Sequence, residues 1–331
     1  MSHPVYDIGI DIGGTKCAVI LGKHAQQAAQ LPEIVSRSAF DTIRDGSYQS
    51  TLSRLFDEIR TVLSSHTLSP GDIRGIGISC GGPLDSSTGR ILSPPNLPGW
   101  DDVPVTELVR EHFGIPCYLQ NDANACALAE WNWGAAKGTR HAVFLTFGTG
   151  MGAGLILNSA LYEGASGLAG EVGHIRLATQ GPVGFGKAGS FEGFCSGGGI
   201  VEILKTLLLE EWQQGHHPPV CPAPDALKEL TTKKAARFAL DGDALCLKAF
   251  DLSARHLGRG LSILIDVLNP EVIVIGSVYA RASALFETTM RAVIKEETLP
   301  VSGNACRIAP AVLGDSIGDY AALSVACRAN E

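Results

Sequence analysis

Short apolar runs recur along this chain, and most of them end at Gly, Pro or Asp. Runs of this length with such endings are typical of buried or half-buried strands. The predicted strands lie at 5–12, 17–22, 73–79, 116–120, 141–147, 152–158, 271–276 and 306–309.

Longer stretches place apolar residues three and four positions apart, the spacing of an amphipathic helix. The pattern is clearest at 47–65, and the Pro-rich segment 215–224 is expected to form a surface loop. Further helices are predicted at 104–113, 123–137, 197–213, 242–267, 283–297 and 316–329. Strands mixed with long helices predict an α/β fold.

Two glycine-rich turns of similar design interrupt the strands, one in each half of the chain. The first follows Asp11 at Gly13-Gly14-Thr15, and the second is Gly148-Thr149-Gly150 within 143–154. Glycine backbone approaches a ligand closely, and exposed N–H groups and Thr hydroxyls hold phosphate oxygens. Either turn alone is equally compatible with an ordinary hairpin. The matched pair predicts a nucleotide held between two related lobes.

Size, charge and cysteine content limit which classes of protein this chain can belong to. The length of 331 residues predicts about two domains, and 39 glycines exceed the usual share of about 7%. A net charge of −8 with no basic run argues against nucleic acid or an anionic membrane as partner. The nine scattered cysteines fit reduced thiols in a cytoplasmic protein. Neither a signal peptide before the first strand nor a membrane-spanning stretch is expected.

The most pointed polar cluster is 120–124, which follows the predicted strand at 116–120 and opens an Ala-rich helix. Asn121 and Asp122 suit helix capping. Alternatively, Asp122 faces the edge of the sheet where open α/β folds bind ligands. A carboxylate there can take the proton from a hydroxyl that attacks a γ-phosphate.

Four further polar residues lie in apolar or Gly-rich surroundings: Asn96, Glu171, His174 and Glu192. Carboxylates and amides without Lys or Arg nearby suit a polyhydroxylated ligand, because they accept hydrogen bonds from its hydroxyl groups. Each residue taken singly is also compatible with an ordinary solvated loop.

At this point the chain resembles the ROK sugar kinases, a branch of the actin-like ATPase superfamily. The resemblance rests on motifs in the family's order over nearly the whole chain. These are Asp11-x-Gly13-Gly14-Thr15-Lys16, Cys80-Gly81-Gly82-Pro83-Leu84-Asp85, Pro95-Asn96-Leu97, Asn121-Asp122-Ala123-Asn124, Gly148-Thr149-Gly150-x-Gly152-x-Gly154, Glu171-Val172-Gly173-His174, Glu192-x-x-x-Ser196-Gly197 and Leu268-Asn269-Pro270-Glu271-x-x-Val274-Ile275-Gly276.

The resemblance implies a function and a role for each matched residue. It implies an ATP-dependent, glucokinase-like hexose kinase of carbohydrate metabolism, with Asp122 as general base and Mg²⁺ accompanying the ATP. The implied sugar ligands are Asn96, Asn121, Glu171, His174 and Glu192. The implied phosphate-lining residues are Asp11, Gly13, Gly14, Thr15, Lys16, Thr149 and Gly150. Gly276 and Ser277 would lie near the adenosine.

The resemblance also implies an architecture. We expect two actin-like, ribonuclease H-like lobes with a cleft between them, and a homodimer. Residues 1–122 with the C-terminal helix 315–331 are expected to form the small lobe, and 123–314 the large lobe.

One stretch departs from the family pattern. Most members carry Cys-x-Cys-Gly-x-x-Gly-Cys-x-Glu, which binds a structural zinc together with the histidine that corresponds to His174. Here Val183, Phe185 and Ser190 replace the three cysteines, and zinc needs about four N, S or O ligands. We therefore expect no structural zinc, with apolar packing of Val183 and Phe185 as one way to stiffen the loop. A site rebuilt from His174, Cys195, His216, His217 and Cys221 is the alternative.

Two non-catalytic hypotheses remain beside the kinase. The same family includes sugar-sensing repressors, but these need a helix-turn-helix before the first strand, and here only six residues precede Asp7. A sugar-binding protein that has lost catalysis is the other. The sequence leaves the sugar open: glucose is the first choice, followed by N-acetylmannosamine, N-acetylglucosamine and fructose.

Overall fold

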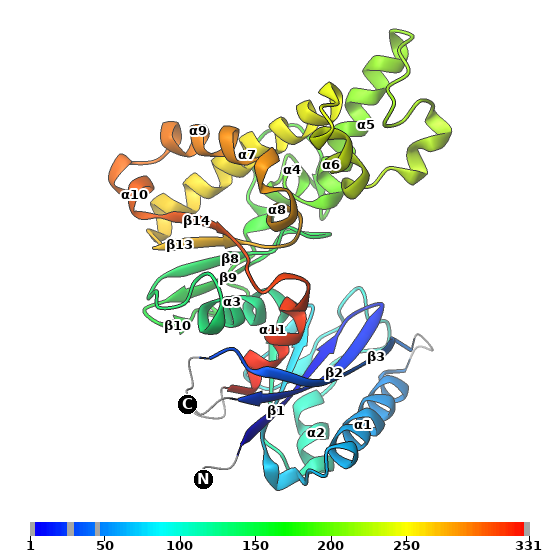
Figure 1. Cartoon of the computed structure of the whole chain (residues 1–331), viewed down its shortest axis with the longest axis vertical. Coiled ribbons are helices and arrows are strands. Elements are labelled where there is room, and N and C mark those ends of the chain that lie inside the picture. The colour runs from blue at the N-terminus through cyan, green and yellow to red at the C-terminus, as the bar shows by residue number, and fades with distance from the viewer. Residues whose placement is uncertain (1–3, 25–29, 44–46, 328–331) are drawn as a thin grey trace. The chain divides into compact units, whose positions relative to one another are not determined.

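The structure is a computed structural model that describes residues 4–24, 30–43 and 47–327 (Figure 1). The chain forms two compact units. Unit 1 comprises 1–138, 161–169 and 313–331, and unit 2 comprises 139–160 and 170–312.

Unit 1 is built on a five-stranded sheet in the order β3-β2-β1-β4-β7. Its strands are β1 (Val5–Ile12), β2 (Lys16–His24), β3 (Glu33–Asp41), β4 (Ile73–Cys80) and β7 (Cys117–Asn121). The first three pair antiparallel, whereas β4 and β7 run parallel to β1. The helices are α1 (Tyr48–Ser65), α2 (Val105–Phe113), α3 (Asp122–Trp133) and α11 (Ile317–Ala326). Shorter elements are β5 (Leu84–Asp85), β6 (Arg90–Ile91) and 3₁₀ turns at Pro70–Asp72 and Gly314–Ser316.

The two faces of this sheet differ because side chains alternate along each strand. In Figure 1, α1 and α2 lie on one face and α11 on the other. On the α1 face, Ile8, Ile10 and Ile12 of β1 are buried in one apolar cluster with Leu55 and Ile59 of α1. Their neighbours in β1, which point to the other face, include a glycine and two aspartates.

Helix α11 lies directly on this glycine-bearing face. A Cβ at Gly9 would come within 2.9 Å of the Ala322 side chain, and one at Gly77 would overlap the Ala322 carbonyl oxygen and the Ala326 amide. Alanines on the helix therefore meet glycines on the strands, which is how a helix backbone approaches a sheet closely.

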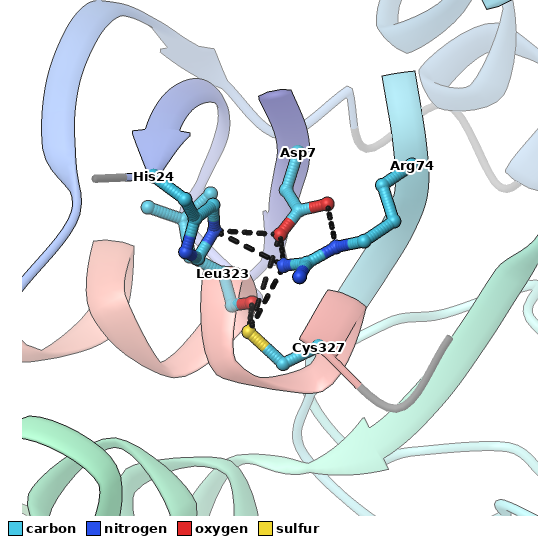
Figure 2. Close-up of polar contacts among 5 residues, drawn as sticks. All are labelled: Asp7, His24, Arg74, Leu323 and Cys327. Atoms are coloured by element: carbon cyan, nitrogen blue, oxygen red, sulfur yellow. Dashed lines mark hydrogen bonds and ion pairs between the residues drawn. The ribbon is translucent and has the colours of Figure 1, made fainter. Parts of the chain in front are cut away.

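A buried polar cluster joins the end of α11 to the same sheet. Figure 2 shows Asp7, His24, Arg74 and Cys327 pointing toward one another, from β1, β2, β4 and the residue after α11. His24 Nε2 lies 2.7 Å from Asp7 Oδ2, and the Arg74 guanidinium donates to both Asp7 oxygens. Arg74 Nη2 also lies 3.4 Å from Cys327 Sγ. The Asp7 carboxylate is fully buried, so it depends on Arg74 for its neutralisation.

Unit 2 has a second five-stranded sheet, in the order β10-β9-β8-β13-β14. Its strands are β8 (Ala142–Leu145), β9 (Ala153–Leu157), β10 (Ala160–Leu161), β13 (Val272–Ile275) and β14 (Arg307–Pro310). Its helices are α4 (Phe191–Phe194), α5 (Gly197–Gln213), α6 (Thr232–Leu240), α7 (Ala244–Leu268), α8 (Ser277–Ala282), α9 (Glu287–Glu297) and α10 (Pro300–Ala305). A small hairpin pairs β11 (Val183–Gly184) with β12 (Lys187–Ala188), and 3₁₀ turns occur at Val172–His174, Pro224–Glu229 and Ser283–Leu285.

Most predicted elements are present, with shifts at their ends. Strand β3 was not predicted, and neither were the two-residue strands β5, β6, β10, β11 and β12 or the helices α4, α6, α8 and α10. The predicted helix 316–329 ends at Ala326 in the structure, and its last two residues lie outside the described residues. None of the helices in the described ranges is long and apolar enough to span a membrane.

The compact units also differ from the expected division at residue 122. Helix α3 belongs to unit 1, where it packs on β7 and α11, and 161–169 joins the same unit. A break after the strand at 116–120 would separate α3 from the apolar surface it covers.

We expect Gly77→Ala to lower the free energy of unfolding of unit 1 by about 3 kcal/mol, because the added Cβ overlaps backbone atoms of α11. Urea unfolding followed by tryptophan fluorescence measures this, since Trp100, Trp131 and Trp133 all lie in unit 1. Gly71→Ala is the matched control, because its Cβ would meet nothing closer than 3.8 Å. Equal stability of the two variants would contradict the close seating of α11.

Candidate functional site

The first glycine turn of unit 1 joins β1 to β2 and is held from two sides. The Gly13 amide donates to the Lys16 carbonyl at 3.0 Å, and the Thr42 hydroxyl donates to the Gly13 carbonyl at 2.6 Å. A Cβ at Gly14 would come within 2.7 Å of the Asn96 carbonyl oxygen. The structure therefore brings Asn96 against the turn that the sequence analysis assigned to phosphate.

The predicted base lies at the carboxyl end of β7. Asn121 is the N-cap of α3, and its side-chain oxygen accepts from the Ala123 amide at 3.0 Å. Asp122 is the first residue of α3, is exposed, and accepts from the same amide at 2.8 Å. Both side chains therefore cap the Ala123 amide, and Asp122 does so through one of its two oxygens.

Asp11 and Asp122 interact electrostatically within unit 1. Burial raises the pKa of Asp11 to about 6, and the negative charges of Asp122 and Asp319 contribute to this rise, whereas Arg37 opposes it. Burial also raises the pKa of the Cys80 thiol, and the negative charges of Asp122 and Asp11 add to this rise. Carboxylates that raise the pKa of a neighbouring carboxyl favour a bound divalent cation, since oxygen is the ligand that Mg²⁺ prefers.

Arg37 and Asp319 were not singled out from the sequence. Arg37 Nε on β3 donates to both Asp319 oxygens on α11 at 2.9 Å, across 282 residues of chain. The Asp319 carboxylate is nearly buried by this pairing. Nothing in the local sequence around either residue indicates the other.

In unit 2 the second glycine turn contacts Glu192. The Met151 amide donates to Glu192 Oε2 at 3.0 Å, and a Cβ at Gly150 would come within 2.7 Å of the same oxygen. Thr149 is exposed at the tip of the turn. A candidate sugar ligand and a candidate phosphate turn are therefore in direct contact.

Glu171 and His174 lie at the two ends of the same 3₁₀ turn. The His174 amide donates to the Glu171 carbonyl at 3.2 Å. A Cβ at Gly173 between them would overlap the Met151 carbonyl oxygen and come within 3.3 Å of Glu192 Cβ. All three sugar candidates of unit 2 thus surround one turn of backbone.

Gly276 and Ser277 lie beside the same glycine turn. The Gly276 amide donates to the Leu145 carbonyl at 2.9 Å, and Ser277 begins α8. A Cβ at Gly148 would lie 3.6 Å from the Ser277 hydroxyl oxygen. This places the residues proposed for adenosine next to those proposed for phosphate, within unit 2.

The two cysteines of the alternative zinc site, and His217, contact backbone carbonyl groups in the structure. Cys195 Sγ points to the Ser253 carbonyl and Cys221 Sγ to the Ala223 carbonyl, while His217 Nδ1 lies 2.9 Å from the Pro222 carbonyl oxygen. Across the described ranges, the one set of three converging metal-ligand atoms is Asp7, His24 and Cys327 of unit 1. Arg74 already places its guanidinium among these atoms.

Comparison with known proteins places this geometry in a family. A profile of the ROK family matches residues 7–328. The glucokinase of Halalkalibacterium halodurans is 31% identical over 315 residues, which cover 94% of this chain and 92% of that protein. The xylose repressor of Caldicellulosiruptor bescii is 30% identical over 293 residues, which cover 88% of this chain and 70% of that protein.

Solved structures show the same fold. A ROK family glucokinase from Streptomyces griseus, in complex with glucose and AMPPNP, matches with a TM-score of 0.74 at 26% identity. The match covers 98% of this chain and 99% of that one. The predicted α/β, actin-like fold is thereby confirmed, and the relatives include both kinases and repressors.

We expect Asp11→Asn to stabilise the protein at pH 7 by roughly 2–3 kcal/mol. The pKa of Asp11 is about 6 in the fold and 3.8 without it. Between pH 3.8 and about 6 the folded state therefore keeps a proton on Asp11 that the unfolded state has lost. As pH rises through this range, ionisation of Asp11 destabilises the fold. The amide that replaces this carboxyl cannot ionise, so the advantage of the variant should vanish near pH 4.

Urea unfolding of both proteins from pH 4 to 7.5 tests this, with the exposed Asp57→Asn as control in the same unit. A stability difference independent of pH would contradict the raised pKa.

Proposed function

Because this chain belongs to the ROK family, we propose that it is an ATP-dependent kinase that transfers the γ-phosphoryl group of Mg-ATP to a hydroxyl of a free hexose. Glucose is the first candidate, then N-acetylmannosamine, N-acetylglucosamine and fructose. The observation that carries the proposal is the exposed Asp122 carboxylate, whose charge helps to raise the pKa of the half-buried Asp11. A base beside a cation-binding carboxylate and a glycine turn is what phosphoryl transfer requires.

In this proposal Asp122 accepts the proton of the attacking sugar hydroxyl, as general bases do over hydrogen-bond distance. The amides of Gly13, Gly14 and Thr15, with Lys16, bind phosphate oxygens. Thr149 and Gly150 do the same in unit 2, and Gly276 borders the adenosine. Asp11 would hold Mg²⁺, which neutralises phosphate charge when bound.

The sugar ligands proposed are Asn96 and Asn121 in unit 1, and Glu171, His174 and Glu192 in unit 2. Carboxylate and amide oxygens accept hydrogen bonds from sugar hydroxyls, and the Asn amides also donate. Contacts with the Met151 backbone already hold Glu192 and the 3₁₀ turn of His174 in place. We further propose a cytoplasmic homodimer.

A sugar-sensing protein without catalysis is the second candidate, favoured by the 30% identity to a xylose repressor. Absence of ADP release with every sugar, together with clear thermal stabilisation by one of them, would favour this second candidate over the kinase. DNA binding in a gel-shift assay would support a regulator in particular.

We expect Asp122→Ala to lower kcat at least about 100-fold, the scale for loss of a general base. Hexose binding, measured by isothermal titration calorimetry, should be retained, because other residues hold the sugar. Asp57→Asn, an exposed carboxylate change in the same unit, should leave turnover unchanged. Near wild-type turnover of Asp122→Ala would remove the basis of the assignment.

The substrate is tested by a coupled ADP-release assay with Mg-ATP and a panel of free hexoses and N-acetylhexosamines. We expect turnover of one of these sugars. Prior treatment with a zinc chelator, followed by excess Mg²⁺, should leave the rate unchanged, because the residues around His174 offer no zinc donor set. A rate that falls with the chelator and returns with Zn²⁺ would show that zinc is needed.

A further inference from the structure

A hairpin turn in unit 2 places an aromatic ring against His174. Phe185 lies between β11 and β12, and its ring meets the imidazole edge-to-face, with centroids 5.2 Å apart and planes at 79°. The Phe185 side chain is 75% exposed. Phe185 and Gly186 form the two-residue turn of the hairpin, with φ of +44° and +75°, and positive φ at both positions is typical of such turns, although a bulky residue is rare there.

Lys187 on the same hairpin holds the backbone of His174. Its ammonium group donates to the His174 carbonyl oxygen at 2.7 Å. Two more bonds tie the hairpin to the chain after His174: Arg176 Nη1 donates to the Ala188 carbonyl at 2.7 Å, and the Leu177 amide to the Gly189 carbonyl at 2.9 Å. The hairpin thus contacts both the ring and the backbone of His174.

The same hairpin also packs on the short helix α4, which carries Glu192. A Cβ at Gly184 would come within 2.6 Å of the Gly193 amide and 2.9 Å of Glu192 Cβ. Gly184 therefore lies directly against the backbone of α4. One hairpin supports both His174 and Glu192.

Burial does not explain this hairpin. Val183 and Phe185 are 61% and 75% exposed, so the expected stiffening by apolar packing is not what the structure shows. Among the described residues, His174 also belongs to no converging set of metal-ligand atoms.

We infer that Phe185 and Lys187 are positioning residues that fix the orientation of His174 and thereby set the affinity for the sugar. The edge of one ring against the face of the other restricts imidazole rotation, and the Lys187 bond fixes its backbone. The sugar part of this inference rests on the proposed function.

The first test needs no sugar. NMR spectra of the histidine Cε1–H resonances are compared for wild type, Phe185→Ala, Phe185→Tyr and Val183→Ala, with His174 assigned through His174→Gln. We expect Phe185→Ala to shift the His174 resonance, Phe185→Tyr to restore it, and Val183→Ala to leave it in place. Val183 is the matched control because it is an exposed apolar residue of the same hairpin. An unshifted His174 resonance in Phe185→Ala would overturn the inference.

The second test uses steady-state kinetics with glucose. Phe185→Ala and Lys187→Met should each raise the KM for glucose about three- to tenfold, the range for an edge-to-face aromatic pair or a charge-assisted hydrogen bond. The kcat should stay within about twofold, since neither residue is placed at the reacting atoms, and Phe185→Tyr should rescue KM.

A shifted resonance with an unchanged KM would overturn the link to sugar affinity, and so would an equal effect of Val183→Ala. If no sugar of the panel is phosphorylated, the proposed function fails, while the NMR comparison still decides whether Phe185 holds His174. Thermal unfolding of each variant confirms that the fold is retained.

Discussion

Helix α11 lies against the sheet of unit 1 only because the strands beneath it carry glycines where the helix backbone passes. Gly9 and Gly77 leave no space for a Cβ under Ala322 and Ala326. The rest of this unit depends on that contact. At one end of the helix Asp319 approaches Asp11 and changes its pKa, and at the other end Cys327 joins the Asp7–Arg74 cluster. A change in the seating of α11 would therefore alter the charge balance beside the first glycine turn.

The face of β1 beneath α11 carries two charged residues in a strand that is otherwise mostly apolar. Asp7 and Asp11 are carboxylates in a strand whose other face is entirely apolar. Asp7 is neutralised internally by Arg74, whereas Asp11 is left with other carboxylates and a more distant arginine. Two aspartates four residues apart thus differ in their surroundings: Asp7 is paired with an arginine, and the pKa of Asp11 is raised by burial and by neighbouring carboxylates.

Much of the fold could be predicted because its signals are local. Strand alternation, helical spacing and capping residues such as Asn121 act over a few residues, and the glycine turns follow directly from their sequences. Strand β3 was missed because its side chains alternate between exposed and half-buried positions, without the apolar run that marks β1 and β4. The pair Arg37–Asp319 could not be predicted, since only the folded chain brings them together.

The candidate site shows the same limit. Its residue types were recognisable from motifs, and the contact of Glu192 with the turn at Gly150 became visible only in the structure. The replacement of the three family cysteines could be recognised from the sequence, but the contacts of the residues that replace them could not. Apolar replacements in a sequence suggest burial, whereas here Phe185 is exposed and contacts one imidazole.

The order of the segments in unit 1 has a consequence for synthesis on the ribosome. Unit 1 needs both its first strands and 313–326, whereas the segments of unit 2 all lie between them. Most of unit 2 leaves the ribosome before α11 does, so the glycine face of β1 and β4 stays uncovered while unit 2 is being synthesised. Ala18 and Ile20, which pack under Leu323, are exposed during that interval. The first segment translated is thus among the last to finish folding, which favours early binding by a chaperone.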